Sequence, residues 1–316
     1  MKPFAMISAS VLIFALAVGA SDEAANQTEI DAYVTRNYDK KTWFPKGSKP
    51  VASGTRNFDY NFTLNELQLA QCAYCYASSA DHVYVPKTAT VTSILEADGG
   101  RVLTGYDTYT KTLFVSFRGS EDIQNWIENV KFFKTAPYTD MPNVEVEIGF
   151  NNWYNNLKNA GLSDALTAAA ATYGTKSVSI TGHSSGGACS TLMAFDMKRG
   201  GYPGFSVSTV TTFGSPRVGN SDFYSAFTSL VSDAEATRVT HYRDIVPHMP
   251  QEFMGYHHVY NEVYFNEDSS EFTICDGSGE DADCSNSCGP LHCTSVSDHL
   301  DYMNLPLGSD NCAVQR

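Results

Sequence analysis

The chain has 316 residues and a formal net charge of −14, from 35 acidic and 21 basic side chains. This length suffices for one large α/β domain or two small ones, and a hydrophobic content of 42% is typical of a globular protein with a buried core. The acidic balance argues against nucleic acid and anionic lipid as partners, because both would repel the chain, but it does not exclude apolar contact with a neutral oil surface.

The first residues have the pattern of an export signal. A short basic start precedes an apolar run over residues 4–18 and small residues up to Ala20, which predicts a secretory signal peptide over residues 1–20. The run is too short to span a bilayer comfortably, which disfavours a membrane anchor. Residues 21–60 are polar with several prolines and glycines, so we expect an N-terminal extension or propeptide. Neither a repeat nor a linker interrupts the remainder, so residues 61–316 are expected to form a single domain.

Two further features fit secretion. Asn26 and Asn61 each begin an Asn-x-Thr acceptor site for glycosylation. The chain has eight cysteines, as expected in an oxidising compartment. Four of them lie in one acidic loop, namely Cys275, Cys284, Cys288 and Cys293. A zinc site that includes the adjacent His292 is an alternative there, but the loop has no Cys-x-x-Cys pair, so disulfides are favoured and no metal site is predicted.

The predicted elements begin with a helix and a hairpin. Residues 63–80 have apolar positions at helical spacing, and their first four residues match a capping box. Residues 83–94 are expected to be irregular with one short strand. Residues 101–107 and 112–117 alternate polar and apolar side chains around a threonine-rich turn, which predicts a β-hairpin.

A short amphipathic helix is expected directly after this hairpin. Within residues 121–130, Ile123, Trp126 and Ile127 lie at helical spacing. Such a helix can pack permanently on the core. Its place at the end of a strand supports a second interpretation, in which it is a lid that covers an apolar site and opens to expose it.

Strands and helices alternate along the rest of the chain. The expected strands are residues 177–180, 207–213, 238–242 and 259–265, and the expected helices are residues 153–171, 188–199 and 223–231. This alternation is typical of a mostly parallel sheet with helices on both faces, so the predicted fold class is α/β.

The strongest motif is Gly-x-Ser-x-Gly, formed by residues 182–186 around Ser184. It is the sequence of a nucleophile elbow, a strained strand-to-helix turn in which Gly182 and Gly186 let the neighbouring segments approach. A serine between glycines also occurs in ordinary turns. The predicted strand before the motif and the predicted helix after it favour the elbow, with Ser184 as the nucleophile.

A serine nucleophile needs a base and a group that orients the base, and in elbow enzymes the acid precedes the histidine. Asp244 follows a predicted strand, where the ligand-facing edge of a parallel sheet is built. Asp222 and Asp233 are weaker candidates. Five histidines come after Asp244, namely His248, His257, His258, His292 and His299. His299 begins the last predicted element and leaves enough chain to return to the site, but spacing alone leaves its rivals open.

The negative charge that develops during acyl transfer needs hydrogen-bond donors. One donor is expected to be the backbone N–H of Ser185, directly after the nucleophile. Ser120, just after the second strand of the hairpin, is placed to supply another through its N–H and its hydroxyl. Ser120 can also cap the short helix that follows, and the two roles are compatible.

With these residues assembled, the chain resembles the secreted fungal class 3 lipases of the Rhizomucor type from about Leu64 to Cys312. The motifs that carry the resemblance are Phe117-Arg118-Gly119-Ser120, Ile123 with Asn125-Trp126-Ile127, Gly149-Phe150, Gly182-His183-Ser184 with Gly186-Gly187-Ala188, Pro216-Arg217-Val218-Gly219-Asn220, Asp244-Ile245-Val246-Pro247 and Asp298-His299-Leu300. The resemblance implies an α/β-hydrolase-like fold with a Ser184–Asp244–His299 triad, an oxyanion hole at Ser120 and Ser185, and a helical lid that carries Ile123, Trp126 and Ile127.

The resemblance also implies two disulfides, Cys75 with Cys312 and Cys275 with Cys284. A third pair, Cys288 with Cys293, is expected only from proximity in the sequence. Cys72 and Cys189 remain unassigned, and Cys189 is expected to be a buried free thiol in the helix after the elbow.

Two positions depart from the family pattern. Ser185 stands where leucine is usual, which keeps the backbone N–H but changes the pocket wall. Glu147 stands where histidine usually precedes Gly-Phe, which would place a charge near the acyl groove and alter substrate preference.

The resemblance implies a secreted, extracellular triacylglycerol lipase that hydrolyses acylglycerol esters at a lipid–water interface, with residues 61–316 as its catalytic domain. We expect no cofactor, no nucleic acid, no integral membrane insertion and a monomer. An esterase of the same fold, such as a feruloyl esterase or a phospholipase A1, is the alternative, although the apolar face of the expected lid favours a lipase. A catalytically silent lipid-binding homologue is disfavoured, because all three triad residues are present.

Overall fold

The computed structural model describes residues 58–76, 84–289 and 292–312. The predicted signal peptide over residues 1–20, nearly all of the predicted extension over residues 21–60, and Asn26 lie outside the described residues. They stay predictions.

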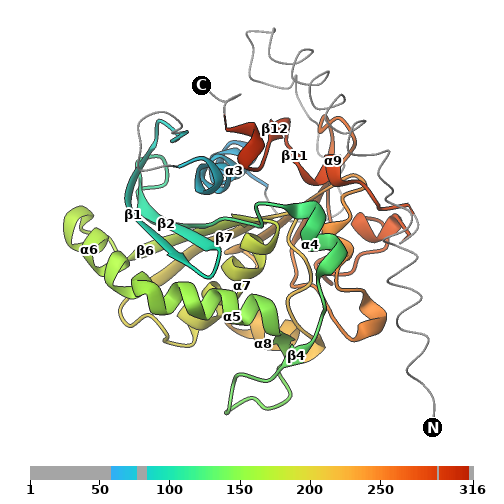
Figure 1. The fold of residues 1–316 in the computed structure, drawn as a ribbon, viewed down its shortest axis with the longest axis horizontal. Helices are drawn as coiled ribbons and strands as arrows, with labels where there is room; N and C mark the ends of the chain where they lie inside the picture. Colours follow the sequence, from blue (N-terminus) through green and yellow to red (C-terminus); the bar gives the residue numbers. More distant parts are fainter. Residues whose placement is uncertain (1–57, 77–83, 290–291, 313–316) are drawn as a thin grey trace, which may run out of the picture.

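An eight-stranded sheet forms the centre of the molecule (Figure 1). In spatial order its strands are β1 (Ala89–Ala97), β2 (Gly100–Asp107), β3 (Thr112–Phe117), β6 (Ser177–His183), β7 (Ser206–Phe213), β8 (Ala236–His241), β9 (Glu262–Phe265) and β10 (Phe272–Ile274). Neighbouring strands from β3 to β9 pair in parallel, whereas β1, β2 and β10 form antiparallel pairs at the two edges. The α/β class with a mostly parallel central sheet is therefore confirmed.

Helices cover both faces of this sheet. They are α3 (Tyr60–Cys75), α4 (Ile123–Asn129), α5 (Ile148–Leu157), α6 (Ser163–Tyr173), α7 (Ser185–Lys198), α8 (Ser221–Leu230) and α9 (Val296–His299). Figure 1 shows α3 on one face and α5, α6 and α7 on the other. Strand β3 packs on both layers, because Leu113 and Val115 join the core under α5–α8 while Phe114 joins the core under α3. Among the described residues, no helix combines the length and apolar character that crossing a bilayer requires.

Two short pairs of strands lie outside the main sheet. They are β4 (Lys134–Thr135) with β5 (Val146–Glu147), and β11 (Asp301–Tyr302) with β12 (Leu305–Pro306). Single 3₁₀ turns occupy Val246–His248, Glu252–Met254, Ser285–Ser287 and Ser309–Asn311.

The first helix differs from the prediction. Helix α3 begins at Tyr60 rather than at residue 63, because the Asp59 carboxylate accepts a hydrogen bond from the Phe62 N–H and caps the helix. The predicted capping box is wrong. Thr63 instead donates its hydroxyl to the Asp59 carbonyl, and Glu66 is buried against the sheet.

Two other segments also depart from the prediction. Residues 89–97 form a nine-residue strand where a short one was expected, because a turn with positive φ at Asp98 and Gly99 folds this strand back onto β2. The helix expected over residues 153–171 starts at Ile148 and changes direction through a π-turn at Lys158–Leu162 before α6. Gly161, with φ 111°, permits that break.

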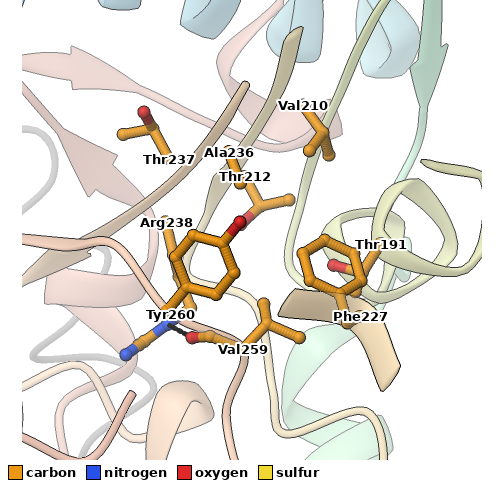
Figure 2. A pocket seen from close by; sticks show the side chains of 9 residues that line it. All are labelled: Thr191, Val210, Thr212, Phe227, Ala236, Thr237, Arg238, Val259 and Tyr260. Carbon is orange, nitrogen blue, oxygen red and sulfur yellow. Dashed lines mark hydrogen bonds between the residues drawn. The ribbon is translucent and has the colours of Figure 1, made fainter. Parts of the chain in front are cut away.

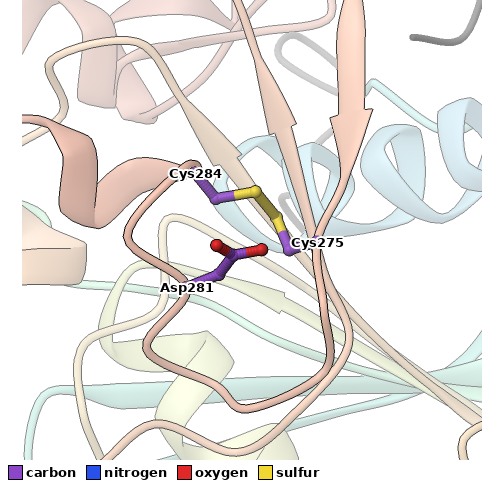
Figure 3. Close-up of side chains that lie close together, drawn as sticks. All are labelled: Cys275, Asp281 and Cys284. Atoms are coloured by element: carbon purple, nitrogen blue, oxygen red, sulfur yellow. A yellow bond between two sulfur atoms is a disulfide. The ribbon is translucent and has the colours of Figure 1, made fainter. Parts of the chain in front are cut away.

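The cysteines form three disulfides among the described residues, Cys75–Cys312, Cys275–Cys284 and Cys288–Cys293. The first ties α3 to the end of the chain, and Figure 1 shows β12 beside α3. Figure 3 shows Asp281 next to the Cys275–Cys284 bond, a grouping with the spacing of a metal site. Both sulfur atoms are already bonded to each other, so this group does not support the zinc alternative. Cys72 and Cys189 are buried free thiols.

Glu66 is a buried carboxyl group between α3 and the sheet. Its side chain is fully buried, and one oxygen accepts a hydrogen bond of 2.7 Å from the Ser179 hydroxyl. Its other oxygen has no hydrogen-bond partner among the described residues. Burial raises the pKa of Glu66 from 4.5 to about 8, and the hydrogen bond from Ser179 only partly offsets this rise. Glu66 is therefore protonated in the folded protein at neutral pH.

We predict that Glu66 makes the folded state less stable as the pH rises. The pKa of Glu66 is higher in the folded state than in the unfolded state. The contribution of Glu66 to the free energy of unfolding is therefore fully present below pH 4.5 and is lost as the pH rises to about 8. The Glu66→Gln variant should lack this loss and gain on the order of 5 kcal/mol relative to wild type between these limits. Urea unfolding at pH 5 and pH 8.5 measures the difference. Glu271→Gln, which alters an exposed carboxylate, is the control, and parallel pH profiles for wild type and Glu66→Gln would contradict the prediction.

Candidate active site

The strand–turn–helix expected around Ser184 is present. Strand β6 ends at His183, helix α7 begins at Ser185, and Ser184 between them has φ 60° and ψ −134°. This conformation is costly for a residue with a side chain and is typical of a nucleophile elbow. The flanking glycines are required by close approach, since a Cβ on Gly182 would lie 2.4 Å from the Gly186 carbonyl oxygen and one on Gly186 would lie 2.2 Å from the Phe117 oxygen.

The structure pairs Asp244 with His299. The Asp244 Oδ2 atom lies 2.9 Å from His299 Nδ1 and accepts a second hydrogen bond of 2.5 Å from the Tyr302 hydroxyl. The Val246 N–H donates to the other oxygen at 2.8 Å. Burial, together with the neighbouring Asp244 carboxylate, raises the pKa of Tyr302 well above its usual value, so Tyr302 stays a donor. These bonds fix the His299 ring with Nδ1 toward the carboxylate and Nε2 free to act as a base.

Ser184 and His299 both carry buried polar atoms without a partner. Ser184 Oγ and His299 Nε2 have no hydrogen-bond partner among the described residues. The two side chains are 1% and 0% exposed. The His183 ring lies 4.4 Å from the His299 ring, centroid to centroid, so the elbow and His299 are direct neighbours. Unpartnered buried polar groups are unfavourable for stability, and their occurrence at one place is typical of a functional site.

Two serine N–H groups are available beside the elbow. Neither the Ser120 nor the Ser185 N–H has an acceptor in the part of the chain that the structure describes. Their hydroxyl oxygens lie 3.2 Å apart, so the end of β3 and the start of α7 meet here. Gly119 allows this approach, because a Cβ there would lie 2.2 Å from the Tyr74 hydroxyl and 2.9 Å from Ser184 Cβ. The arrangement can donate hydrogen bonds to a negatively charged oxygen bound next to Ser184.

A buried hydrogen-bonded chain connects these segments. The Tyr74 hydroxyl lies 2.9 Å from His183 Nδ1, and His183 Nε2 lies 2.8 Å from the His299 carbonyl oxygen. Burial, and then the nearby His299, lowers the pKa of His183 well below its usual value, so the ring is neutral. It therefore accepts from Tyr74 and donates to His299. Sequence reasoning missed Tyr74 and Tyr302, because nothing in their local sequence indicates contact with residues more than 50 positions away.

The rival candidates lie elsewhere. His257 Nδ1 and His258 Nε2 contact backbone carbonyls of His258 and Pro247. Asp222 and Asp233 are exposed, in and after α8. Of the acids and histidines considered, Asp244 and His299 are the pair that the fold brings together beside Ser184.

Gly214, directly after β7, borders the same atoms. Its φ is +54°, and a Cβ there would lie 2.8 Å from Asp244 Oδ2, 2.9 Å from the Tyr302 hydroxyl and 3.0 Å from His299 Nδ1. We expect Gly214→Ala to displace His299 and lower kcat for a soluble ester at least about 10-fold. Gly174→Ala is the control, since Gly174 also has positive φ, +69°, but nothing lies within 4 Å of its Cβ position. Equal kcat in the two variants would show that the close contacts have no effect.

The expected lid is helix α4. The Asp122 side chain caps it by accepting from the Asn125 N–H, and none of its residues is fully buried. Trp126 stacks on Phe150 at 6.2 Å between ring centroids and faces Phe132 edge-on. Trp126 thus packs against the core, and Asn125, Glu128 and Asn129 give the helix a polar outer surface.

Glu147 is turned inward. Its carboxylate accepts a hydrogen bond of 2.7 Å from the Phe150 N–H and caps α5, and burial raises its pKa. This hydrogen bond, which caps α5, explains why an acidic side chain occupies position 147.

A small cavity lies away from these residues. It has a volume of about 10 Å³ and is lined by residues such as Val210, Phe227 and Tyr260 (Figure 2). A space of this size accepts about one water molecule, so this cavity is not a substrate site.

Comparison with known proteins places the chain in a family. The model of the class 3 lipase family matches residues 114–254. A lipase of Rhizomucor miehei is 34% identical over 201 residues, which are 63% of this chain and 53% of that protein, so the chain spans about half of that relative's length. Secreted mono- and diacylglycerol lipase 1 of Fusarium solani is 31% identical over 237 residues, which are 69% of this chain and 68% of that protein. The chain belongs to the class 3 lipases.

A solved structure that is similar in fold supports the same placement. It is a triacylglycerol lipase whose catalytic centre is described as a serine protease triad. The two structures agree with a TM-score of 0.69 at 28% sequence identity, over 80% of this chain and 96% of that one. The predicted α/β-hydrolase-like fold is therefore confirmed.

Proposed function

We propose that this chain hydrolyses the carboxylic ester bonds of acylglycerols, as a triacylglycerol lipase with Ser184, Asp244 and His299 as its catalytic triad. The observation that carries the proposal is the Asp244–His299 pair beside a strained, buried serine whose hydroxyl has no partner within residues 58–76, 84–289 and 292–312. The triacylglycerol lipase with a serine protease triad, which is similar in fold, supports it.

The geometry supports the following reaction. His299 Nε2 removes the proton from Ser184 Oγ, and the oxygen attacks the ester carbonyl. The N–H groups of Ser120 and Ser185 stabilise the negatively charged oxygen of the tetrahedral intermediate. His299 then gives the proton to the leaving alcohol, and Asp244 stabilises the charged ring meanwhile. Water, activated by His299, releases the fatty acid from the acyl-enzyme. These steps use only groups of the chain, and we propose no cofactor.

Access to Ser184 requires an opening motion, because a side chain that is 1% exposed cannot meet a substrate. We assign this motion to α4. The helix follows directly after Ser120 in the oxyanion hole, and no residue of α4 is fully buried, so few packing contacts must break to displace it. Ile123, Trp126 and Ile127 would turn from the core toward lipid as the lid opens.

Exposed apolar side chains lie next to the lid. Phe133 is 64% exposed, and its carbonyl accepts from the N–H of Ile148, another exposed residue. Phe253 is 80% exposed. The Lys134 Nζ atom donates a hydrogen bond to the carbonyl oxygen of Met254. Phe253, next to Met254, therefore lies near Phe133, which is next to Lys134. Exposed apolar groups beside α4 favour docking on a neutral lipid surface, whereas a charge of −14 would oppose an anionic one.

The test is the initial rate against tributyrin concentration across its solubility limit. A lidded lipase should gain rate abruptly, by about 10-fold, when an emulsion forms. Phe133→Ser with Phe253→Ser should weaken this gain and leave hydrolysis of a soluble ester unchanged. Tyr109→Ser is the matched control, because Tyr109 is 49% exposed but lies in the β2–β3 turn, at the opposite end of β3 from Ser120.

Saturation below the solubility limit without a further rise would contradict interfacial action. It would leave the serine hydrolase intact and favour the esterase alternative, a feruloyl esterase or a phospholipase A1.

We also propose an extracellular location for the protein. Three disulfides and an exposed sequon at Asn61 support it. The signal peptide over residues 1–20, the extension over residues 21–60, the single catalytic domain over residues 61–316, glycans on Asn26 and Asn61, and a monomeric state complete the proposal.

A further inference from the structure

The side chain of Ser185 has an unusual environment for a residue that supplies a backbone donor. Ser185 is the first residue of α7 and is fully buried. A buried hydroxyl needs a hydrogen-bond partner, and among the described residues the partner of this one is the Ser120 hydroxyl, 3.2 Å away. Among the residues that the structure describes, the Ser120 hydroxyl in turn has only the Ser185 hydroxyl as a partner. The two hydroxyl groups therefore form a closed pair inside the proposed oxyanion hole.

The pair can be arranged in two ways, because each hydroxyl has one proton. If Ser120 donates to Ser185, its proton is used and cannot reach the substrate. If Ser185 donates to Ser120, the Ser120 proton is free to point at the substrate oxygen. Negative charge on that oxygen favours the second arrangement, since each hydrogen bond in such a chain polarises and strengthens the next.

We propose that the Ser185 hydroxyl is a positioning group for catalysis, which holds the Ser120 hydroxyl as a third donor to the oxyanion, beside the N–H groups of Ser120 and Ser185. This inference rests on the proposed function and adds a role that the backbone of Ser185 alone does not supply. Ser185 acts through Ser120, so removal of its hydroxyl should lower kcat without changing KM, because the oxyanion exists only after substrate has bound.

A double-mutant cycle on a soluble p-nitrophenyl ester tests the proposal, because a soluble substrate separates it from lid opening at an interface. Ser120→Ala should lower kcat about 100-fold, as loss of an oxyanion donor does. Ser185→Ala should lower kcat about 5-fold, the effect of one neutral hydrogen bond. In the Ser120→Ala background the second change should have no further effect, because the group that Ser185 orients is gone.

Ser190→Ala is the matched control. Ser190 is also fully buried on α7, where its hydroxyl donates to the Gly186 carbonyl at 2.8 Å, and its loss should leave kcat unchanged. Ser185→Thr, which keeps a hydroxyl, should recover most of the rate. Titration with a fluorophosphonate counts functional sites in every variant, so that misfolded protein does not count as slow enzyme.

The outcomes separate the two proposals. A 5-fold loss on Ser185→Ala in both backgrounds, or no loss in either, would overturn the positioning role while the hydrolase stands. A wild-type protein that neither hydrolyses the ester nor reacts with the fluorophosphonate would overturn the proposed function itself.

Discussion

Ser184→Ala is expected to lower kcat for any ester substrate by about 10⁵-fold, since the hydroxyl is the proposed nucleophile and the oxyanion donors alone retain little catalysis. The same change should leave the protein as stable as wild type or more stable. The Ser184 hydroxyl is buried and has no partner in the described part of the chain, so its removal deletes a polar group whose burial is unfavourable. Steady-state kinetics and a thermal unfolding curve on one preparation measure both effects.

The combination of lost activity and retained stability is the specific result. Loss of activity accompanied by a clearly lower Tm would instead indicate a structural role for Ser184. Wild-type turnover in this variant would mean that the nucleophile is another residue. Reaction of the wild-type protein with a fluorophosphonate, absent in Ser184→Ala, identifies the modified atom independently.

Removal of the Cys75–Cys312 disulfide is expected to lower the free energy of unfolding by roughly 5 kcal/mol. The bond joins residues 237 positions apart, so without it the unfolded chain gains far more conformational freedom than it does for a short loop. It also holds the C-terminal strands against α3, the helix that carries Tyr74. Urea unfolding of the double variant Cys75→Ser with Cys312→Ser gives the value.

The Cys288–Cys293 disulfide is the internal control. Its cysteines are only five positions apart, and its removal should cost roughly 2 kcal/mol. The two double variants thus compare the same chemical change at very different loop lengths. Equal destabilisation would show that native contacts, rather than the entropy of the unfolded chain, set the contribution of these bonds.

The sequence by itself was sufficient to predict the structural features that depend on local pattern. The alternation of strands and helices gave a mostly parallel sheet, because periodicity reflects which side chains face the core. The Gly-x-Ser-x-Gly motif predicted the elbow, since only glycine tolerates the close approach at residues 182 and 186. Spacing alone could not choose among five histidines. It was the family resemblance that favoured His299, and the fold then placed this residue beside Asp244.

Local sequence pattern did not predict the structure correctly where contact with a residue far along the chain determined it. The capping box at Thr63 was plausible in sequence, but the Glu66 carboxyl group binds the Ser179 hydroxyl, 113 positions away, and the nearby Asp59 caps the helix instead. Strand β1 is long because β2 offers it a full edge for hydrogen bonding, which no local propensity records.

Only the tertiary structure assembled the surroundings of the candidate triad. Tyr302 joins Asp244 across 58 positions, and Tyr74 joins His183 across 109 positions. Gly214 leaves space for the Asp244–His299 pair, and the hydroxyl of Ser185 meets that of Ser120. Each of these contacts joins residues that lie on separate elements. The sequence can name the groups that perform the chemistry, because their types and order follow from the reaction. The groups that hold them in place are chosen by packing, which brings together positions that sequence spacing does not relate.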